Sequence, residues 1–130
     1  MINEKTTHYK VVFPRDLNNN GTLFGGLAMQ WMDEVAYIAA TRYARKKMVT
    51  VSVSKINFIA PVVPNVIVEV SGTVQKVSSA KMEVLVEIFQ EDMYSDSRNK
   101  AVDATFIFAA VDKNNKPVRL LESKAELPIR

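Results

Sequence analysis

One segment of this chain restricts its fold more than any other. From about Gly26 to Arg45 the side chains are almost all apolar, and at the helical period they cover most of the circumference. The polar side chains fall in one narrow arc, which consists of Gln30, Glu34, Thr41 and Arg45. A helix of this kind has to be buried on most sides. A single antiparallel sheet can bury it by curling around it, so the segment predicts one long helix wrapped by a curved sheet.

The remaining segments predict the strands of that sheet. Runs rich in β-branched and aromatic residues, separated by short turns, lie at 8–13, 48–60, 66–77, 80–91 and 101–112. The apolar phase shifts within 48–60, which predicts a β-bulge near Ser54 and Lys55. Residues 101–112 are apolar on both faces and predict a central strand covered on both sides. We expect an α+β fold with five to six antiparallel strands in a single domain of residues 1–130, and an irregular tail after Pro117.

The composition argues against several classes of function. The chain has no cysteine and a single histidine, His8, which argues against a metal site, a cysteine nucleophile and a Ser-His-Asp triad. The net charge of +3 is mild and the cations are not interleaved with aromatic residues, so we expect no nucleic-acid partner. Neither a secretory leader nor a membrane-spanning segment is recognisable, so we expect a cytoplasmic protein with no membrane partner.

A glycine-rich run leads directly into the predicted helix and contains three of the four glycines, Gly21, Gly25 and Gly26. Backbone N–H groups at a helix start can bind an anion or stabilise an oxyanion, and Gly25, Gly26 and Leu27 carry the candidate groups. The run lacks the Gly-Lys-Ser/Thr ending of a phosphate loop and the Gly-x-Gly-x-x-Gly pattern of a dinucleotide fold. Taken alone, the glycines equally suit a tight turn and helix entry.

Asp33 is the one acid of the helix that lies outside the polar arc. Its helical neighbours are all apolar or aromatic, namely Met29, Ala36, Tyr37 and Ala40. A carboxylate in such surroundings is costly to bury unless it is hydrogen-bonded or used in chemistry. Two interpretations stay open: a general acid/base or nucleophile, or a group that is simply solvated at a dimer edge. For Glu34, on the polar arc, we expect a solvated helix face.

Several motifs together resemble the acyl-CoA thioesterases of the hotdog fold. The first is the run Asn18-x-x-Gly21-Thr22-Leu23-Phe24-Gly25-Gly26, followed by Trp31-Met32-Asp33-Glu34. The likeness continues through Val49 to Val53, Ile56 to Val62 and Ala104 to Asp112. It covers the chain from about Asn18 to Pro117, and it is the combination and spacing of these pieces that is specific. The resemblance implies a hotdog fold, a long central helix wrapped by a curved antiparallel sheet.

The resemblance also implies an activity and a set of site residues. The substrate would be an acyl-CoA, hydrolysed to free acid and coenzyme A with no separate cofactor. Asp33 would be the catalytic group, either activating water or attacking directly, and Asn18 would complete the site from the partner subunit of a homodimer. Asn19 and Asn20 compete for that role, and spacing favours Asn18. The oxyanion and substrate-binding positions would be Gly25, Gly26, Thr50 and Ser79. Family members are often dimers assembled into hexamers, as trimers of dimers.

Two departures and two alternative functions accompany this interpretation. The turn after Pro61 reads Pro64-Asn65-Val66 where the family usually has Gly-Asp, and Val77 replaces a glycine that is common before the serines. These departures lie in turns, so they bear on substrate preference more than on activity. A non-catalytic acyl-CoA-binding or sensing protein is one alternative. A hydratase is the other, although His8 is badly placed for it. The sequence leaves the acyl chain length open.

Overall fold

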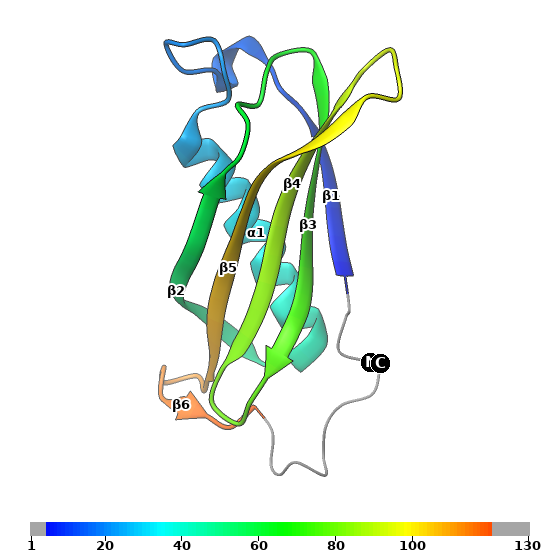
Figure 1. The fold of residues 1–130 in the computed structure, drawn as a ribbon. Coiled ribbons are helices and arrows are strands. Elements are labelled where there is room, and N and C mark those ends of the chain that lie inside the picture. Colours follow the sequence, from blue (N-terminus) through cyan, green and yellow to red (C-terminus); the bar gives the residue numbers. More distant parts are fainter. Residues whose placement is uncertain (1–4, 121–130) are drawn as a thin grey trace.

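One long helix and six strands make up the computed structural model, which describes residues 5–120 (Figure 1). The helix α1 runs from Gly25 to Ala44, after a short 3₁₀ turn, η1 (Pro14–Asp16). The strands are β1 (Lys5–Val11), β2 (Lys47–Phe58), β3 (Val66–Val77), β4 (Met82–Asp92), β5 (Arg98–Val111) and β6 (Pro117–Val118). Residues 1–4 and 121–130 lie outside the described part of the chain.

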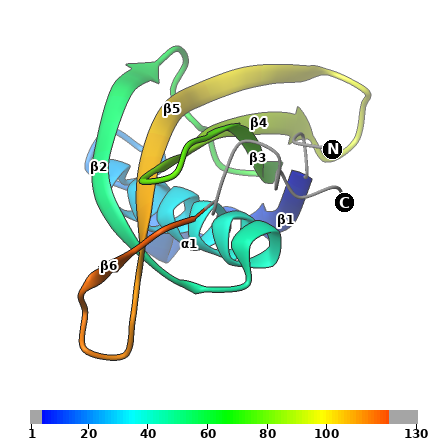
Figure 2. The same ribbon diagram turned by 90° about the horizontal axis from the view of Figure 1, so that it is seen from below.

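The strands form one antiparallel sheet in the order β1-β3-β4-β5-β2, and β6 pairs with β5. Seen from below, the sheet bends around α1 from β1 on one side to β2 on the other (Figure 2). This arrangement confirms the predicted α+β architecture of a long helix wrapped by a curved antiparallel sheet. Strands β1 and β2 form the two edges of the main sheet, and no other strand among residues 5–120 pairs with their outer sides.

The core lies between α1 and the concave face of the sheet. The helix buries one side of its surface, made up of Ala28, Trp31, Met32, Val35, Ala36, Ala39, Ala40 and Tyr43. Alternate residues of β3, β4 and β5 face this side, so their burial pattern has the period of two expected for strands. At Gly72 of β3 an added Cβ would lie 3.2 Å from Val35 Cγ1, so the helix approaches the sheet closely there because that residue has no side chain.

The helix is less deeply buried than its sequence predicts. Besides the predicted arc residues Gln30 and Glu34, the exposed side of α1 includes Gly26, Asp33 and Tyr37. The expectation that Asp33 sits in apolar surroundings is therefore wrong for the single chain. The physical reason is that the sheet closes around only one side of α1, and no described element of the same chain covers the other. Within one chain, Asp33 occupies the solvated position that the alternative interpretation proposed.

Strand β2 carries the predicted irregularity. Its register against β5 shifts between Ser54 and Asn57, and Lys55 has φ 53°, which confirms the predicted bulge. A second shift between Thr50 and Ser52 was not predicted. Strand β5 lies inside the sheet, between β4 and β2, but the central strand is β4, and the outer face of β5 is only half-buried and not covered. The predicted irregular tail is corrected at β6, because Pro117 and Val118 pair with β5.

Candidate active site

The loop before α1 is organised by Asn18. Its side-chain Oδ1 accepts hydrogen bonds from the backbone N–H groups of Asn20 at 2.8 Å and Thr22 at 3.2 Å. Its own backbone N–H donates to the Thr22 carbonyl at 2.8 Å, and Gly21 turns the chain with φ 75°. The Asn18 side chain thus folds its own turn, and no hydrogen bond joins it to Asp33 within residues 5–120.

The start of α1 presents free backbone donors. Phe24 occupies the N-cap position without a side-chain hydrogen bond to the helix, and its carbonyl accepts the N–H groups of Leu27 and Ala28, both at 3.0 Å. The N–H groups of Gly25 and Gly26 have no partner in the described residues. Unpaired N–H groups in the first helical turn attract negative charge. This end of α1 can therefore stabilise a carbonyl oxygen that becomes anionic.

A cleft of about 440 Å³ lies beside these donors. Its lining consists of Arg15, Asp16, Leu17, Phe24, Gly26, Leu27 and Gln30. No role was predicted for Arg15 from the sequence, and Gln30 was predicted only as part of the polar arc of the helix. The proline that starts η1 was a sequence signal for a turn here, but nothing in the sequence indicated that the turn would bring Arg15 beside the helix start.

Two turns further along α1, Asp33 contacts β2. The Thr50 hydroxyl donates a hydrogen bond to Asp33 Oδ1 over 3.0 Å, and both residues are exposed. Asp33 Oδ2 accepts no hydrogen bond from any described residue. The pair therefore holds a carboxylate by one oxygen and leaves its second oxygen open to solvent, on the exposed side of the helix that Gly26 also occupies. A carboxylate held this way can accept a proton or attack a carbonyl carbon.

Ser79 lies elsewhere in the single chain. It belongs to the turn between β3 and β4, and its carbonyl accepts the Leu120 N–H at 2.8 Å. That turn is at the end of the sheet where α1 ends, away from the helix start (Figure 1). One chain therefore brings Thr50 to Asp33 and places Gly25 and Gly26 on the same helix, but it does not bring Ser79 or the Asn18 amide to them.

Several large apolar side chains are exposed along the edge strand that carries Thr50. On β2 and the chain after it they are Val49, Val51, Ile56, Phe58 and Ile59, and Tyr37 lies one helical turn beyond Asp33 on α1. Exposed apolar side chains that gather along one edge are typical of a protein–protein contact. The same region has free backbone groups, because β2 is an edge of the sheet.

Within residues 5–120, no three histidine, cysteine, aspartate or glutamate side chains come close enough to hold a metal ion. The helix α1 is not apolar enough over its length to cross a membrane.

The family model of the thioesterase superfamily matches residues 20–96. Among curated relatives, an acyl-CoA thioester hydrolase of Bacillus subtilis, itself described as uncharacterized, is 37% identical over 107 residues, covering 82% of this chain and 62% of that protein. An acyl-CoA thioester hydrolase of Salmonella typhimurium is 33% identical over 110 residues, 82% of this chain and 83% of that protein. A cytosolic acyl coenzyme A thioester hydrolase of rat is 32% identical over 110 residues, 83% of this chain and 29% of that protein.

Solved structures share the fold. An acyl-CoA hydrolase from Bacillus cereus superposes with a TM-score of 0.85 at 36% identity, over 88% of this chain and 70% of that one. An acyl-CoA hydrolase from Staphylococcus aureus, in complex with butyryl coenzyme A, coenzyme A and coenzyme A disulfide, has a TM-score of 0.83 at 31% identity. The match covers 88% of this chain and 70% of that one. Alanine variants of that enzyme at one aspartate, one threonine and one asparagine are also solved. A hexameric broad-specificity acyl-coenzyme A thioesterase has a TM-score of 0.83 at 31% identity, and the match covers 90% of this chain and 86% of that one.

Proposed function

Because this chain belongs to the hotdog-fold acyl-CoA thioesterases, a family of thioester hydrolases, we propose that it hydrolyses acyl-CoA to free acid and coenzyme A, with Asp33 as the catalytic carboxylate. The observation that carries this proposal is the hydrogen bond from Thr50 to Asp33, on the helix whose first N–H groups are unpaired. The chain spans about 62% of the length of the Bacillus subtilis relative, so the activity of a longer protein is part of the proposal.

The proposed chemistry combines the carboxylate of one chain with the helix start of the other. Gly26 and Asp33 lie about 10 Å apart along one helix, so the two groups that act on one thioester come from different chains. The thioester carbonyl oxygen accepts the N–H of Gly26 of the partner subunit, so charge that develops on the oxygen is stabilised by that helix start. The free oxygen of Asp33 either takes a proton from water as the water attacks, or attacks the carbonyl carbon to form an anhydride that water then hydrolyses. In both routes the C–S bond breaks and coenzyme A leaves as the thiol. Thr50 positions the carboxylate.

The Staphylococcus aureus variants support the choice of residues. The asparagine, aspartate and threonine replaced in them follow one another at the same separations along that chain as Asn18, Asp33 and Thr50 do here. No other asparagine of the loop matches this spacing. The agreement favours Asn18 over Asn19 and Asn20, and it favours a supporting role for Thr50.

We further propose that the working unit is a homodimer with shared sites, assembled into a trimer of dimers. The apolar side chains along β2 and the exposed side of α1 are the surface that such a dimer would bury. A two-fold partner would bring its own Asn18 loop to this Asp33, which one chain does not do. A structural relative is described as hexameric. The location we propose is the cytoplasm, as for the cytosolic rat relative.

The activity is tested by thiol release from acyl-CoAs of increasing chain length, read with a thiol-reactive chromophore. Asp33→Asn should lose about 10²- to 10⁴-fold in rate while the circular dichroism spectrum stays unchanged. Glu34→Gln is the matched control, because Glu34 is the adjacent exposed acid of α1, and it should keep the wild-type rate. An Asp33→Asn enzyme that retains most of its rate would refute the assigned chemistry. Acyl-CoA binding without thiol release would instead support the non-catalytic alternative.

The shared site has its own test. Asn18→Ala and Asp33→Asn chains should each be inactive alone, and their co-expression should restore activity. In a mixed dimer one site has both replacements, and the other has an intact Asn18 from one chain and an intact Asp33 from the other. If both groups came from one chain, every mixed site would lack one of them and no activity would return.

A further inference from the structure

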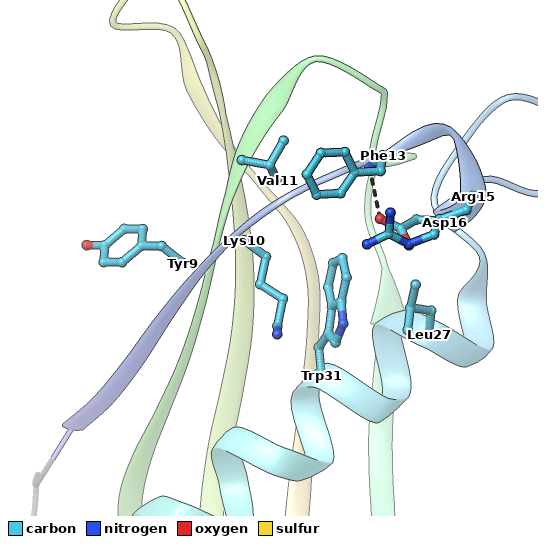
Figure 3. A pocket seen from close by; sticks show the side chains of 8 residues that line it. All are labelled: Tyr9, Lys10, Val11, Phe13, Arg15, Asp16, Leu27 and Trp31. Atoms are coloured by element: carbon cyan, nitrogen blue, oxygen red, sulfur yellow. Dashed lines mark hydrogen bonds between the residues drawn. The ribbon is translucent and has the colours of Figure 1, made fainter.

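A second cleft, of about 320 Å³, lies between β1, η1 and the first turns of α1. Figure 3 shows Phe13 and Trp31 facing one another, with Lys10 on one side of the indole and Arg15 on the other. Leu27 closes the cleft on the helix side, Val11 lies above, and the Tyr9 ring points away. The volume is at the lower end of the range for small-molecule sites, about 300–1,000 Å³.

The lining combines cations with aromatic rings. Lys10 Nζ lies 5.5 Å from the centroid of the Trp31 ring, and Arg15 Cζ lies 4.8 Å from the centroid of the Phe13 ring. The acid of the cleft is already engaged, because Asp16 Oδ2 accepts the Phe13 N–H at 2.8 Å. Two cations therefore face the cleft, and the Phe13 ring is about half exposed. We propose that this cleft binds a nucleotide, with its base stacked on Phe13 and its phosphate held by Lys10 and Arg15.

The cleft is separate from the Asp33 carboxylate. Trp31 and Asp33 are two residues apart on α1, which is about 200° around a helix, so they point to opposite sides. Trp31 faces β1, whereas Asp33 bonds to Thr50 of β2, at the other edge of the sheet. The two clefts nevertheless share Arg15, Asp16 and Leu27, so a ligand in one borders the other.

Two kinds of ligand carry such a nucleotide, coenzyme A and a free nucleotide, and enzyme kinetics distinguish them. If the nucleotide is the nucleotide end of coenzyme A, Lys10→Met should raise KM for acyl-CoA but not for the corresponding acyl-pantetheine, which has no nucleotide. If it is a free nucleotide, Lys10→Met should leave KM for acyl-CoA unchanged and weaken the binding of ADP. Either result supports a nucleotide site in the cleft, because in both the effect of Lys10 depends on the nucleotide.

Trp31 makes the binding test direct, since it is the only tryptophan of the chain and lines the cleft. ADP and coenzyme A are titrated by tryptophan emission and by calorimetry, with adenosine and inorganic phosphate as partial ligands. At least one of the two nucleotides should bind at sub-millimolar concentration, and more tightly than either partial ligand. Lys10→Met and Phe13→Ala should each weaken binding about tenfold. Lys81→Met, which removes an exposed cation of the β3–β4 turn, is the control and should not change it.

The proposal is overturned if neither ADP nor coenzyme A binds at millimolar concentration, or if Lys10→Met and Lys81→Met bind them equally well. It is also overturned if inorganic phosphate alone binds as tightly as the nucleotides. Calorimetry with ADP requires no turnover, so an enzyme that binds ADP but releases no thiol would refute only the hydrolase proposal. An active enzyme that binds no nucleotide here would refute only this one.

Discussion

Gln90 offers a sharp test of how the start of α1 is held in place. It is a buried polar residue of β4, 6% exposed, in the row that faces the core. Its Nε2 donates to the Pro61 carbonyl at 2.9 Å, and its Oε1 accepts the Val63 N–H at 3.2 Å. Val62 lies between Pro61 and Val63, and its carbonyl accepts the N–H of Leu23 at 2.8 Å. Leu23 lies just before the start of α1. Gln90 thus holds the connection between β2 and β3 in place through two hydrogen bonds, and this connection in turn contacts the segment before α1.

Replacing Gln90 with methionine keeps the volume and removes both hydrogen bonds. A buried polar group left without a partner costs about 1–3 kcal/mol. Because both bonds are only part-buried, the lower half of that range applies to each backbone group, for a total of about 2–4 kcal/mol. For a chain of this length 1 kcal/mol corresponds to about 3–5 °C, so the melting temperature should fall by roughly 6–20 °C.

The assay is urea unfolding followed by circular dichroism, with a thermal scan, at one fixed protein concentration because an oligomer's stability depends on concentration. Gln75→Met is the matched control, since Gln75 is an exposed glutamine of β3. Its unfolding free energy should stay within about 0.5 kcal/mol of the wild type. Equal unfolding midpoints for the two variants would show that the Gln90 bonds do not support the connection, and would refute the reasoning.

Three further outcomes are expected. Gly72→Ala should lower the free energy of unfolding by about 1 kcal/mol, because crowding against the helix, worth about 1–3 kcal/mol, exceeds the gain of about 0.4–1 kcal/mol from a stiffer unfolded chain. The hydrogen bond from Asn57, and after it Lys100, holds the pKa of Asp103 in the folded protein below its usual value of 3.8. The stability that Asp103 contributes is therefore present above pH 3.8 and is lost as the pH falls through the lower pKa of the folded protein. Asp103→Asn should make the loss of stability in acid less steep. Thr50→Val should slow thiol release about tenfold, whereas Thr50→Ser should keep most of the rate because its hydroxyl still reaches the Asp33 carboxylate.

Each of these has a measurement that can contradict it. Thermal unfolding of Gly72→Ala at or above the wild-type midpoint would mean that the helix yields to the new methyl group. Urea midpoints that fall in parallel with pH for wild type and Asp103→Asn would remove the stabilising role of that carboxylate. Equal rates for the serine and valine variants of Thr50 would show that its hydroxyl does not matter to the reaction.

Most helices and strands of this fold could be predicted from local patterns of apolar residues in the sequence. The helix that ends at Ala44 and the strands β3 and β4 were predicted to within two residues, because the 3.6 and 2 residue periods of apolar side chains are properties of short segments. The bulge at Lys55 was predicted in the same way, from a change in the phase of the apolar alternation. The pairing of Pro117 and Val118 with β5 was missed, since a two-residue strand has no period to detect.

The sequence by itself determined that a glycine-rich run meets a long apolar helix with one acid, Asp33, and that the remaining segments are strands. Only the tertiary structure decided what each group contacts. Thr50 reaches Asp33 because β2 pairs with β5 in a register that no local pattern specifies, and Lys10 meets Trp31 because the sheet curls until β1 lies beside α1. Asp33 is exposed because the same curl covers only one side of the helix, and side-chain periodicity cannot say how far a sheet will wrap.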